Sequence, residues 1–175
     1  MNLTDHHPKV WPMALQITAF TAAMAATVVV PFVTFLAVYR HRGRRGAVPL
    51  LAFLFGALLW SLTQTMEVVN TALAAKTVWC SAVFLGATIA PAAYLLVTAA
   101  VTGRDRWLTR RSVGAIAAIE ACINGLVWTN PVHGLMLGEP SLATAGSLTA
   151  LEPAFGPLFY FHAGFQYLFV SLGLY

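Results

Sequence analysis

Three ionisable side chains lie inside long apolar stretches of the sequence, where a charge is costly. They are Glu67, Glu120 and His162. Ionisable groups within a bilayer are by default candidates for binding a ligand, an ion or a proton. Residues three or four apart share a helix face, and each of the three has such a polar neighbour. The neighbours are Gln64 before Glu67, Asn124 after Glu120 and Gln166 after His162.

Other kinds of site chemistry lack their residues. The sequence has no HExxH, GxSxG, P-loop or GxGxxG motif and no paired cysteine spacing for a metal. A bis-histidine haem is not expected, because His162 is the only histidine inside an apolar stretch. A retinal Schiff base is not expected either, because it needs a lysine within a span and Lys76 is placed in a turn. Cys80 and Cys122 are interpreted as small packing residues. The sequence predicts no catalysis, no metal and no cofactor.

The composition indicates that these stretches lie in lipid. Of the 175 residues 59% are hydrophobic and 9% are charged, whereas a soluble domain carries roughly 25% charged residues. A bilayer core about 30 Å thick needs about 20 apolar residues per helix. We therefore predict one all-α membrane domain over residues 1–175, a polytopic bundle of about five helices. The expected spans are 10–39, 47–72, 77–101, 112–128 and 155–175, with Pro31 and Pro91 tolerated as kinks.

The basic residues give the bundle a direction. Eight arginines fall in the loops after the first and third spans, whereas Lys9 and Lys76 fall on the other side. The eight are Arg40, Arg42, Arg44, Arg45, Arg104, Arg106, Arg110 and Arg111. Because Lys and Arg are enriched in cytoplasmic loops, these loops are expected inside the cell and the N-terminus outside, in a multi-pass protein of the cell membrane. Basic charge distributed in this way does not indicate nucleic-acid binding.

The polar positions fall at similar depth in the outer half of four spans. At about 1.5 Å per residue, Glu67, Asn124, His162 and Gln16 lie at comparable distances from the outer surface, with Glu120 nearer the middle. We expect them to form a small polar cavity that opens outwards. The competing interpretation is that they are hydrogen-bonded contacts that hold the helices together.

A longer loop, residues 129–154, covers the outer side. Its glycine and proline positions are turn signals. Residues 135–137 and 148–151 are expected either to pair as a hairpin or to lie on the membrane surface.

Short motifs in order along the chain resemble the N-terminal seven-transmembrane sensory region of bacterial and archaeal histidine kinases. They are Trp60 with Glu67; Lys76, Trp79 and Gly86; Pro91 followed by Thr102-Gly103-Arg104; Thr129-Asn130-Pro131-Val132-His133; and Gly156-Pro157-Leu158-Phe159 with Tyr167. Glu120 departs from the family's pattern.

The resemblance implies a signal-input domain and not an enzyme. It implies that the chain is a fragment, ending at Tyr175 after the fifth helix, that lacks two further helices and the output domain. The expected partners are the lipid bilayer, an unidentified extracellular or membrane-borne signal and a cytoplasmic effector domain of the full-length parent; a homodimer is left open. Asn130 and His133 would shape the loop over the cavity, and Glu67 would anchor the signal.

Two other functions remain open. A proton- or ion-coupled transporter or channel would use Glu67 and Glu120 as steps of a path, although few polar residues continue it through the inner half. A purely structural membrane subunit would use the same residues only as helix contacts.

Overall fold

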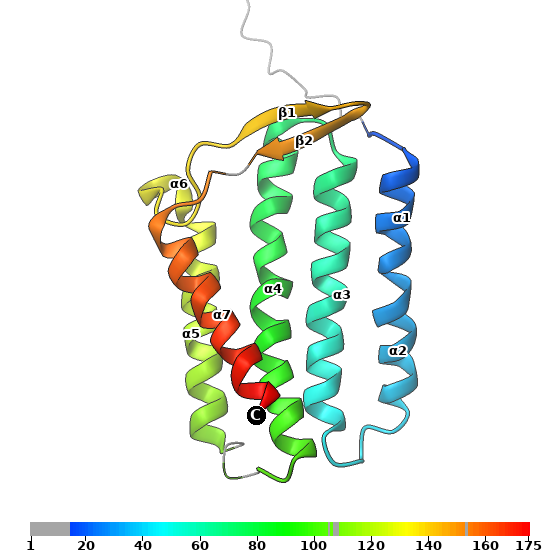
Figure 1. Ribbon diagram of the computed structural model, residues 1–175, viewed down its shortest axis with the longest axis vertical. Coiled ribbons are helices and arrows are strands. Elements are labelled where there is room, and N and C mark those ends of the chain that lie inside the picture. The colour runs from blue at the N-terminus through cyan, green and yellow to red at the C-terminus, as the bar shows by residue number, and fades with distance from the viewer. Residues whose placement is uncertain (1–14, 105, 107–108, 153) are drawn as a thin grey trace, which may run out of the picture.

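Long helices run side by side through the molecule, and a β-hairpin lies across one of its ends (Figure 1). The computed structural model describes residues 15–104, 106, 109–152 and 154–175. Its helices are α1 (Ala19–Thr27), α2 (Val29–Tyr39), α3 (Ala47–Val69), α4 (Leu73–Val101), α5 (Arg110–Trp128), the short α6 (Asn130–His133) and α7 (Pro157–Leu174). Strands β1 (Ser141–Ala145) and β2 (Leu148–Glu152) form the hairpin. We call this side the hairpin end and the opposite side the arginine end, because the α2–α3 and α4–α5 connections, around which the eight arginines fall in the sequence, lie there (Figure 1).

Three of the described helical stretches are long and apolar enough to cross a membrane: Ala19–Tyr39, Ala47–Val69 and Leu73–Val101. The helices differ from the expected spans at several ends: α3 ends at Val69 instead of residue 72, α5 begins at Arg110 instead of residue 112, and α7 begins at Pro157 instead of residue 155. Residues 10–14 of the first expected span lie outside the described residues. Residues 15–18, assigned to the first helix, are not helical, and the third helix begins at Leu73 instead of residue 77. The first span is interrupted at Val28, three residues before Pro31. Proline has no N–H for the carbonyl four residues earlier and crowds that carbonyl, here the one of Thr27, which accounts for the interruption.

Helices α3 and α4 are in contact through their backbones. A Cβ added to Gly86 would lie 2.3 Å from the Trp60 nitrogen and 2.6 Å from the Gly56 oxygen. A Cβ added to Gly56 would lie 2.8 Å from the Ala90 nitrogen. Small residues permit this close approach in membranes, where dispersion contacts between helices replace the hydrophobic effect. The two helices therefore form a tightly packed pair.

Helix α4 is also the centre of the remaining packing. Towards the hairpin end its Phe84 is buried with Ile123 and Val127 of α5 and with Met136 and Leu137 of the loop after α6. Further along, Ala92 and Leu95 are buried against Phe169 of α7. Helices α5 and α7 are thus each anchored on α4.

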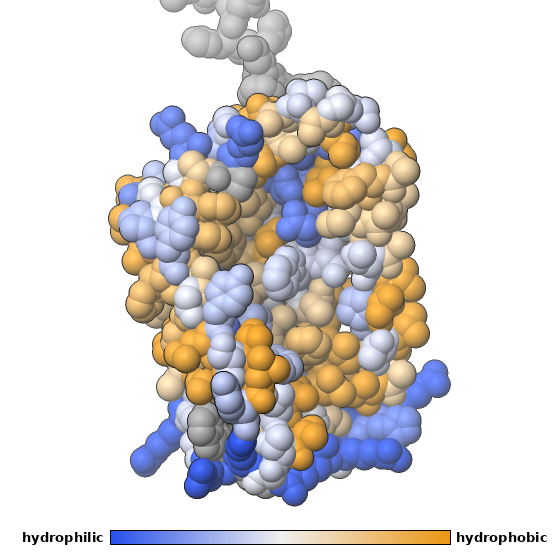
Figure 2. All heavy atoms as spheres, in the orientation of Figure 1, coloured by the Kyte–Doolittle hydropathy of each residue, from blue (hydrophilic) through white to orange (hydrophobic). Residues whose placement is uncertain are grey.

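The outer flanks of the bundle are apolar and uncovered. Helix α2 has no buried residue, and its Val30 is 69% exposed. Figure 2 shows hydrophobic residues over much of the flanks and hydrophilic ones gathered at the arginine end. An exposed apolar surface of this extent is unfavourable in water. The protein is therefore located in a membrane.

The α3–α4 contact generates a stability prediction. We expect Gly86→Ala to lower the free energy of unfolding in detergent by about 1–3 kcal/mol, as is typical of overpacking. The control is Gly125→Ala in α5, where nothing lies within 4 Å of the added Cβ, and it should leave the melting temperature unchanged or raise it. Equal melting temperatures for the two variants would contradict the backbone contact.

Candidate functional site

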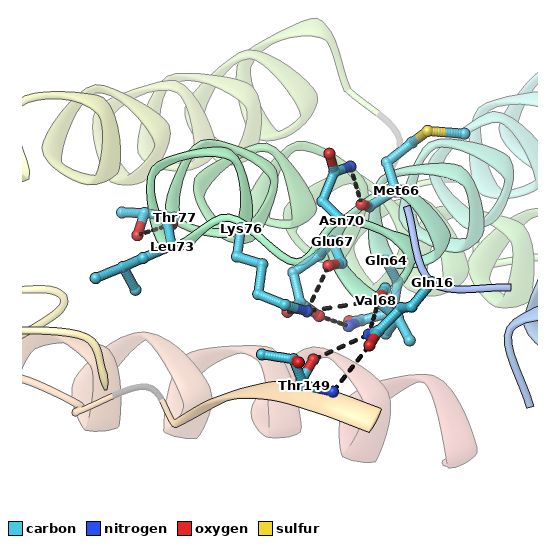
Figure 3. Close-up of polar contacts among 10 residues, drawn as sticks. All are labelled: Gln16, Gln64, Met66, Glu67, Val68, Asn70, Leu73, Lys76, Thr77 and Thr149. Carbon is cyan, nitrogen blue, oxygen red and sulfur yellow. Dashed lines mark hydrogen bonds and ion pairs between the residues drawn. The ribbon is translucent and has the colours of Figure 1, made fainter. Parts of the chain in front are cut away.

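A lysine with no exposed surface ties the hairpin-end tips of α3 and α4 together. Lys76 lies in the first turn of α4 and is 0% exposed. Its Nζ donates to the Glu67 carbonyl oxygen at 2.8 Å, to Glu67 Oε1 at 3.3 Å and to the Val68 carbonyl oxygen at 3.5 Å (Figure 3). The last carbonyls of a helix have no partner within it and carry partial negative charge. The ammonium, which has three N–H donors, therefore satisfies the end of α3.

Glu67 is held from two sides. It is 7% exposed, and its Oε1 forms the ion pair with Lys76 at 3.3 Å. Its Oε2 accepts from Gln64 Nε2 at 2.9 Å. Gln64 and Glu67, which were expected on one helix face, are therefore hydrogen-bonded to each other. Because α4 supplies Lys76, the Glu67 carboxylate also has a polar partner on a second helix.

The placement of Lys76 corrects the sequence analysis. It was assigned to the turn before the third span, but it lies inside α4 and faces the bundle. A cation is unfavourable in the first turn of a helix because of the helix dipole. A lysine three residues after the start of α4, and nine after a glutamate near the end of α3, was the signal that could have identified the pair.

Gln16 connects the hairpin to the same end of α3. Its Nε2 donates to the Val68 oxygen at 2.6 Å and to the Thr149 oxygen at 2.9 Å, while its Oε1 accepts from the Thr149 nitrogen at 2.8 Å (Figure 3). Gln16 was expected within the first span, but it lies before α1 and its backbone nitrogen bonds to the Val69 oxygen at 2.8 Å. The hairpin, the end of α3 and Lys76 thus form one connected set of contacts, which we call the outer clamp.

A second polar group joins α5 and α7. Gln166 Nε2 donates to both carboxyl oxygens of Glu120 at 3.0 Å and lies 3.3 Å from His162 Nδ1. Asn124 Nδ2 donates to Thr88 Oγ1 at 2.9 Å and to the Glu120 carbonyl oxygen at 3.0 Å. The single polar cluster that was expected is therefore two groups, one on α3–α4 and one on α4, α5 and α7.

A cavity of about 640 Å³ separates the two groups. It lies between α3, α4, α7 and β2. Gln64 and Glu67 line one side of it, and His162 and Gln166 line the other. The rest of its wall is largely apolar, with the aromatic residues Trp60, Phe84, Phe155, Phe159 and Tyr167. The prediction of a small polar cavity was therefore wrong in size and lining, and Glu120 and Asn124 do not line it.

The cavity adjoins another space under the outer loop. This second cavity, of about 550 Å³, lies beside α4, α5 and α6. Cys80 and Leu151 line both cavities. Strand β2, which carries Leu151, therefore lies at the boundary between the two cavities.

Asn130 organises the loop over the second cavity. Its Oδ1 accepts from the nitrogens of Met136 and Leu137 at 2.9 and 3.0 Å, and its Nδ2 donates to the Leu137 oxygen at 2.6 Å. His133 Nδ1 accepts from the Leu135 nitrogen at 3.0 Å. Both residues fold the loop.

The expected hairpin had the wrong partner. Residues 148–151 pair with β1 instead of with 135–137, and Leu137 bridges to Phe155. Gly146, with φ of +63°, lies between the two strands, in a conformation that favours glycine.

The chemistry of these groups is hydrogen bonding and charge pairing. Among the described residues, no three His, Cys, Asp or Glu side chains lie close enough together to hold a metal ion. Of buried side-chain oxygens, Gln166 Oε1 and Asn124 Oδ1 have no hydrogen-bond partner in the part of the chain that the structure describes. Gln166, which lines the first cavity, thus has a buried amide oxygen without a described partner.

Comparison with protein families decides where the chain belongs. A family model described as the N-terminal 7TM region of histidine kinase matches residues 22–175. The chain is a member of this family. No curated protein and no solved structure gave a match. The chain thus contains the N-terminal membrane region found in histidine kinases, which is consistent with a sensory input domain.

The motifs that indicated this 7TM region have structural explanations. Glu67 and Lys76 form the buried pair, Gly86 admits the Trp60 backbone, and Asn130 folds the outer loop. A Cβ on Gly156 would lie 2.2 Å from the Leu135 oxygen, so glycine is required where α7 leaves the loop. The motif residues therefore hold the hairpin end of the 7TM region in shape.

The buried pair generates a second prediction. Removing one partner of a buried ion pair costs about 3–5 kcal/mol, whereas removing both costs much less. We expect Lys76→Met and Glu67→Gln each to lower the free energy of unfolding of the 7TM region by about that amount, and the double variant to recover more than half of the summed loss. Chemical unfolding in detergent measures the cycle. Additive losses would show that the two side chains do not interact.

Proposed function

We propose that the chain is a membrane-embedded signal-input domain that crosses the cell membrane five times, with its N-terminus outside. The remaining two spans would be α5 and α7. Their 19 and 18 residues correspond to about 27–29 Å at 1.5 Å per residue, close to the thickness of a bilayer core. The eight arginines gathered at the arginine end support a cytoplasmic position for that end.

The observation that carries this proposal is the cavity between the outer clamp and the α5–α7 group. It presents a carboxylate, two amides and an imidazole from two helices, α3 and α7, within an apolar wall, a composition typical of ligand sites. A signal molecule that enters from the outside, through the adjoining cavity under the loop, would meet Cys80 and Leu151 first. Glu67, Gln64, His162 and Gln166 would then contact its polar groups, whereas Glu120 and Asn124 would act through Gln166 and Thr88.

Helix α7 is the element that would carry the response. Helices α3 and α4 are held together by backbone contact and by Lys76, so they would move as one body. Helix α7 lines the cavity with His162 and Gln166 and ends at the arginine side, where Gly173 lies against the Tyr94 ring. An occupant that changes the contacts of His162 and Gln166 would shift α7 between two packings and so move its cytoplasmic end.

Cysteine labelling tests the proposed orientation. In a Cys80→Ala, Cys122→Ala background, a Ser147→Cys variant places a thiol at the exposed hairpin tip, and a Gly43→Cys variant places one at the arginine end, where a Cβ meets nothing within 4 Å. We expect an impermeant maleimide to label Ser147→Cys in intact cells and Gly43→Cys only after permeabilisation. The reverse pattern would invert the topology.

A kinase fusion tests the signalling role. The chain would be joined to the dimerisation and catalytic regions of a histidine kinase, and autophosphorylation would be measured in membrane vesicles. We expect Glu67→Gln to change the rate by about fivefold or more, the low end of typical coupling between sites. Glu152→Gln, at an exposed carboxylate of β2, should leave the rate unchanged. Equal rates for wild type and Glu67→Gln would favour a purely structural role for the polar groups.

A further inference from the structure

A groove at the arginine end combines an apolar floor with a basic mouth. It has a volume of about 430 Å³ and lies where α2, α3 and α4 meet the turn between α2 and α3. Its floor is formed by Val38, Leu50, Val97 and Val101, and its mouth by His41, Arg44 and Arg45. It is separate from the two cavities at the hairpin end and shares no lining residue with them.

The turn that carries the arginines is fixed by its own backbone bonds. The nitrogens of His41, Arg44 and Ala47 donate to the oxygens of Val38, His41 and Arg44 at 2.8, 2.9 and 3.1 Å. Gly46 has φ of +77° and lies against Ala100 and Val101, so the turn is seated on the end of α4. The mouth of the groove is therefore held in place before any ligand binds, which lowers the cost of binding.

The arginines of this turn are not equivalent. Arg42 lies over its own helix, with its guanidinium carbon 4.8 Å from the Tyr39 ring centroid and Nη1 bonded to the Tyr39 oxygen at 3.4 Å. Arg44 lines the groove, and its side chain makes no hydrogen bond or ion pair with any residue that the structure describes. The Arg44 guanidinium is thus available to an anion.

The described carboxylates lie elsewhere. Glu67, Glu139 and Glu152 are at the hairpin end and Glu120 is midway along α5. Arg44 therefore has no carboxylate partner among the described residues at this end. An anionic ligand would complement the charge of the Arg44 guanidinium.

We propose that this groove binds one anionic phospholipid of the surrounding leaflet. Its phosphate would lie against Arg44 and Arg45, and one acyl chain would follow the floor between α3 and α4. Arginine is suited to phosphate recognition by its planar, multiply donating guanidinium. Basic pockets between transmembrane helices bind anionic headgroups in this way, and the apolar floor gives the acyl chain a surface that a free phosphate ion would leave unused. The inference needs the membrane location alone and is independent of the signalling role.

Lipid retention measured by native mass spectrometry tests the site. The full chain would be purified in a neutral detergent and mixed with phosphatidylglycerol or phosphatidylcholine. We expect phosphatidylglycerol to be retained preferentially, and the Arg44→Gln, Arg45→Gln variant to hold it about thirtyfold more weakly, the change expected for two arginines near an anionic headgroup. The matched control is Arg110→Gln, Arg111→Gln, which removes the same charge from the same end outside the groove and should change retention less than twofold.

Two further measurements distinguish a lipid phosphate from free inorganic phosphate. A Leu50→Gln variant, which places an amide on the floor, should also weaken phosphatidylglycerol retention, while excess inorganic phosphate should not displace the lipid. Gel filtration checks that each variant remains folded. An equal loss of phosphatidylglycerol retention in the Arg110→Gln, Arg111→Gln control would show that the effect depends only on the total charge. Displacement of the lipid by inorganic phosphate would show that the groove is an ion site. Either result overturns the proposal.

Discussion

A lysine ammonium shielded from water needs oxygen atoms as hydrogen-bond acceptors. Lys76 finds these acceptors at the end of α3. Two of its three acceptors are backbone carbonyls of the last turn of α3, and the third is the Glu67 carboxylate. Because buried charges are stable only when paired and hydrogen-bonded, α3 and α4 must meet at this point and in this register. The position of Gln16 follows, since it bonds to the adjacent Val68 carbonyl, and so does that of the hairpin, which Gln16 holds.

This constraint makes α3 and α4 one fixed part of the bundle, and α7 packs on α4 as a second part. Helices α3 and α4 are locked at one end by Lys76 and along their length by Gly56 and Gly86. Helix α7 packs on α4 through a few apolar side chains around Phe169 and contacts Glu120 of α5 through Gln166. The cavity lies between these parts. In the proposed sensor role, occupation of this cavity would favour one of two packings of α7 against the α3–α4 pair.

Much of the architecture was predictable because it depends on local or additive properties. The arginine distribution and the apolar stretches located the loops between α2 and α3 and between α4 and α5, and helical spacing paired Glu67 with Gln64. Contacts between distant segments were not predictable from spacing. The pairing of Lys76 with the end of α3 depends on the geometry of a short turn. The hydrogen bond between Gln16 and Thr149 joins residues 133 positions apart. The division of the polar residues into two groups depends on how α7 crosses α4.

The buried state of Lys76 is the central claim, and the chain offers a direct measurement because its lysines are Lys9 and Lys76. A membrane-permeant amine-reactive reagent would be applied to the Lys9→Arg protein in lipid nanodiscs, and modification at position 76 would be followed by mass spectrometry. Lys76 should remain unmodified in the folded protein, react once the protein is unfolded in sodium dodecyl sulfate, and react measurably in folded Glu67→Gln. Modification of Lys76 in the folded wild-type background at the rate seen after unfolding would contradict the account.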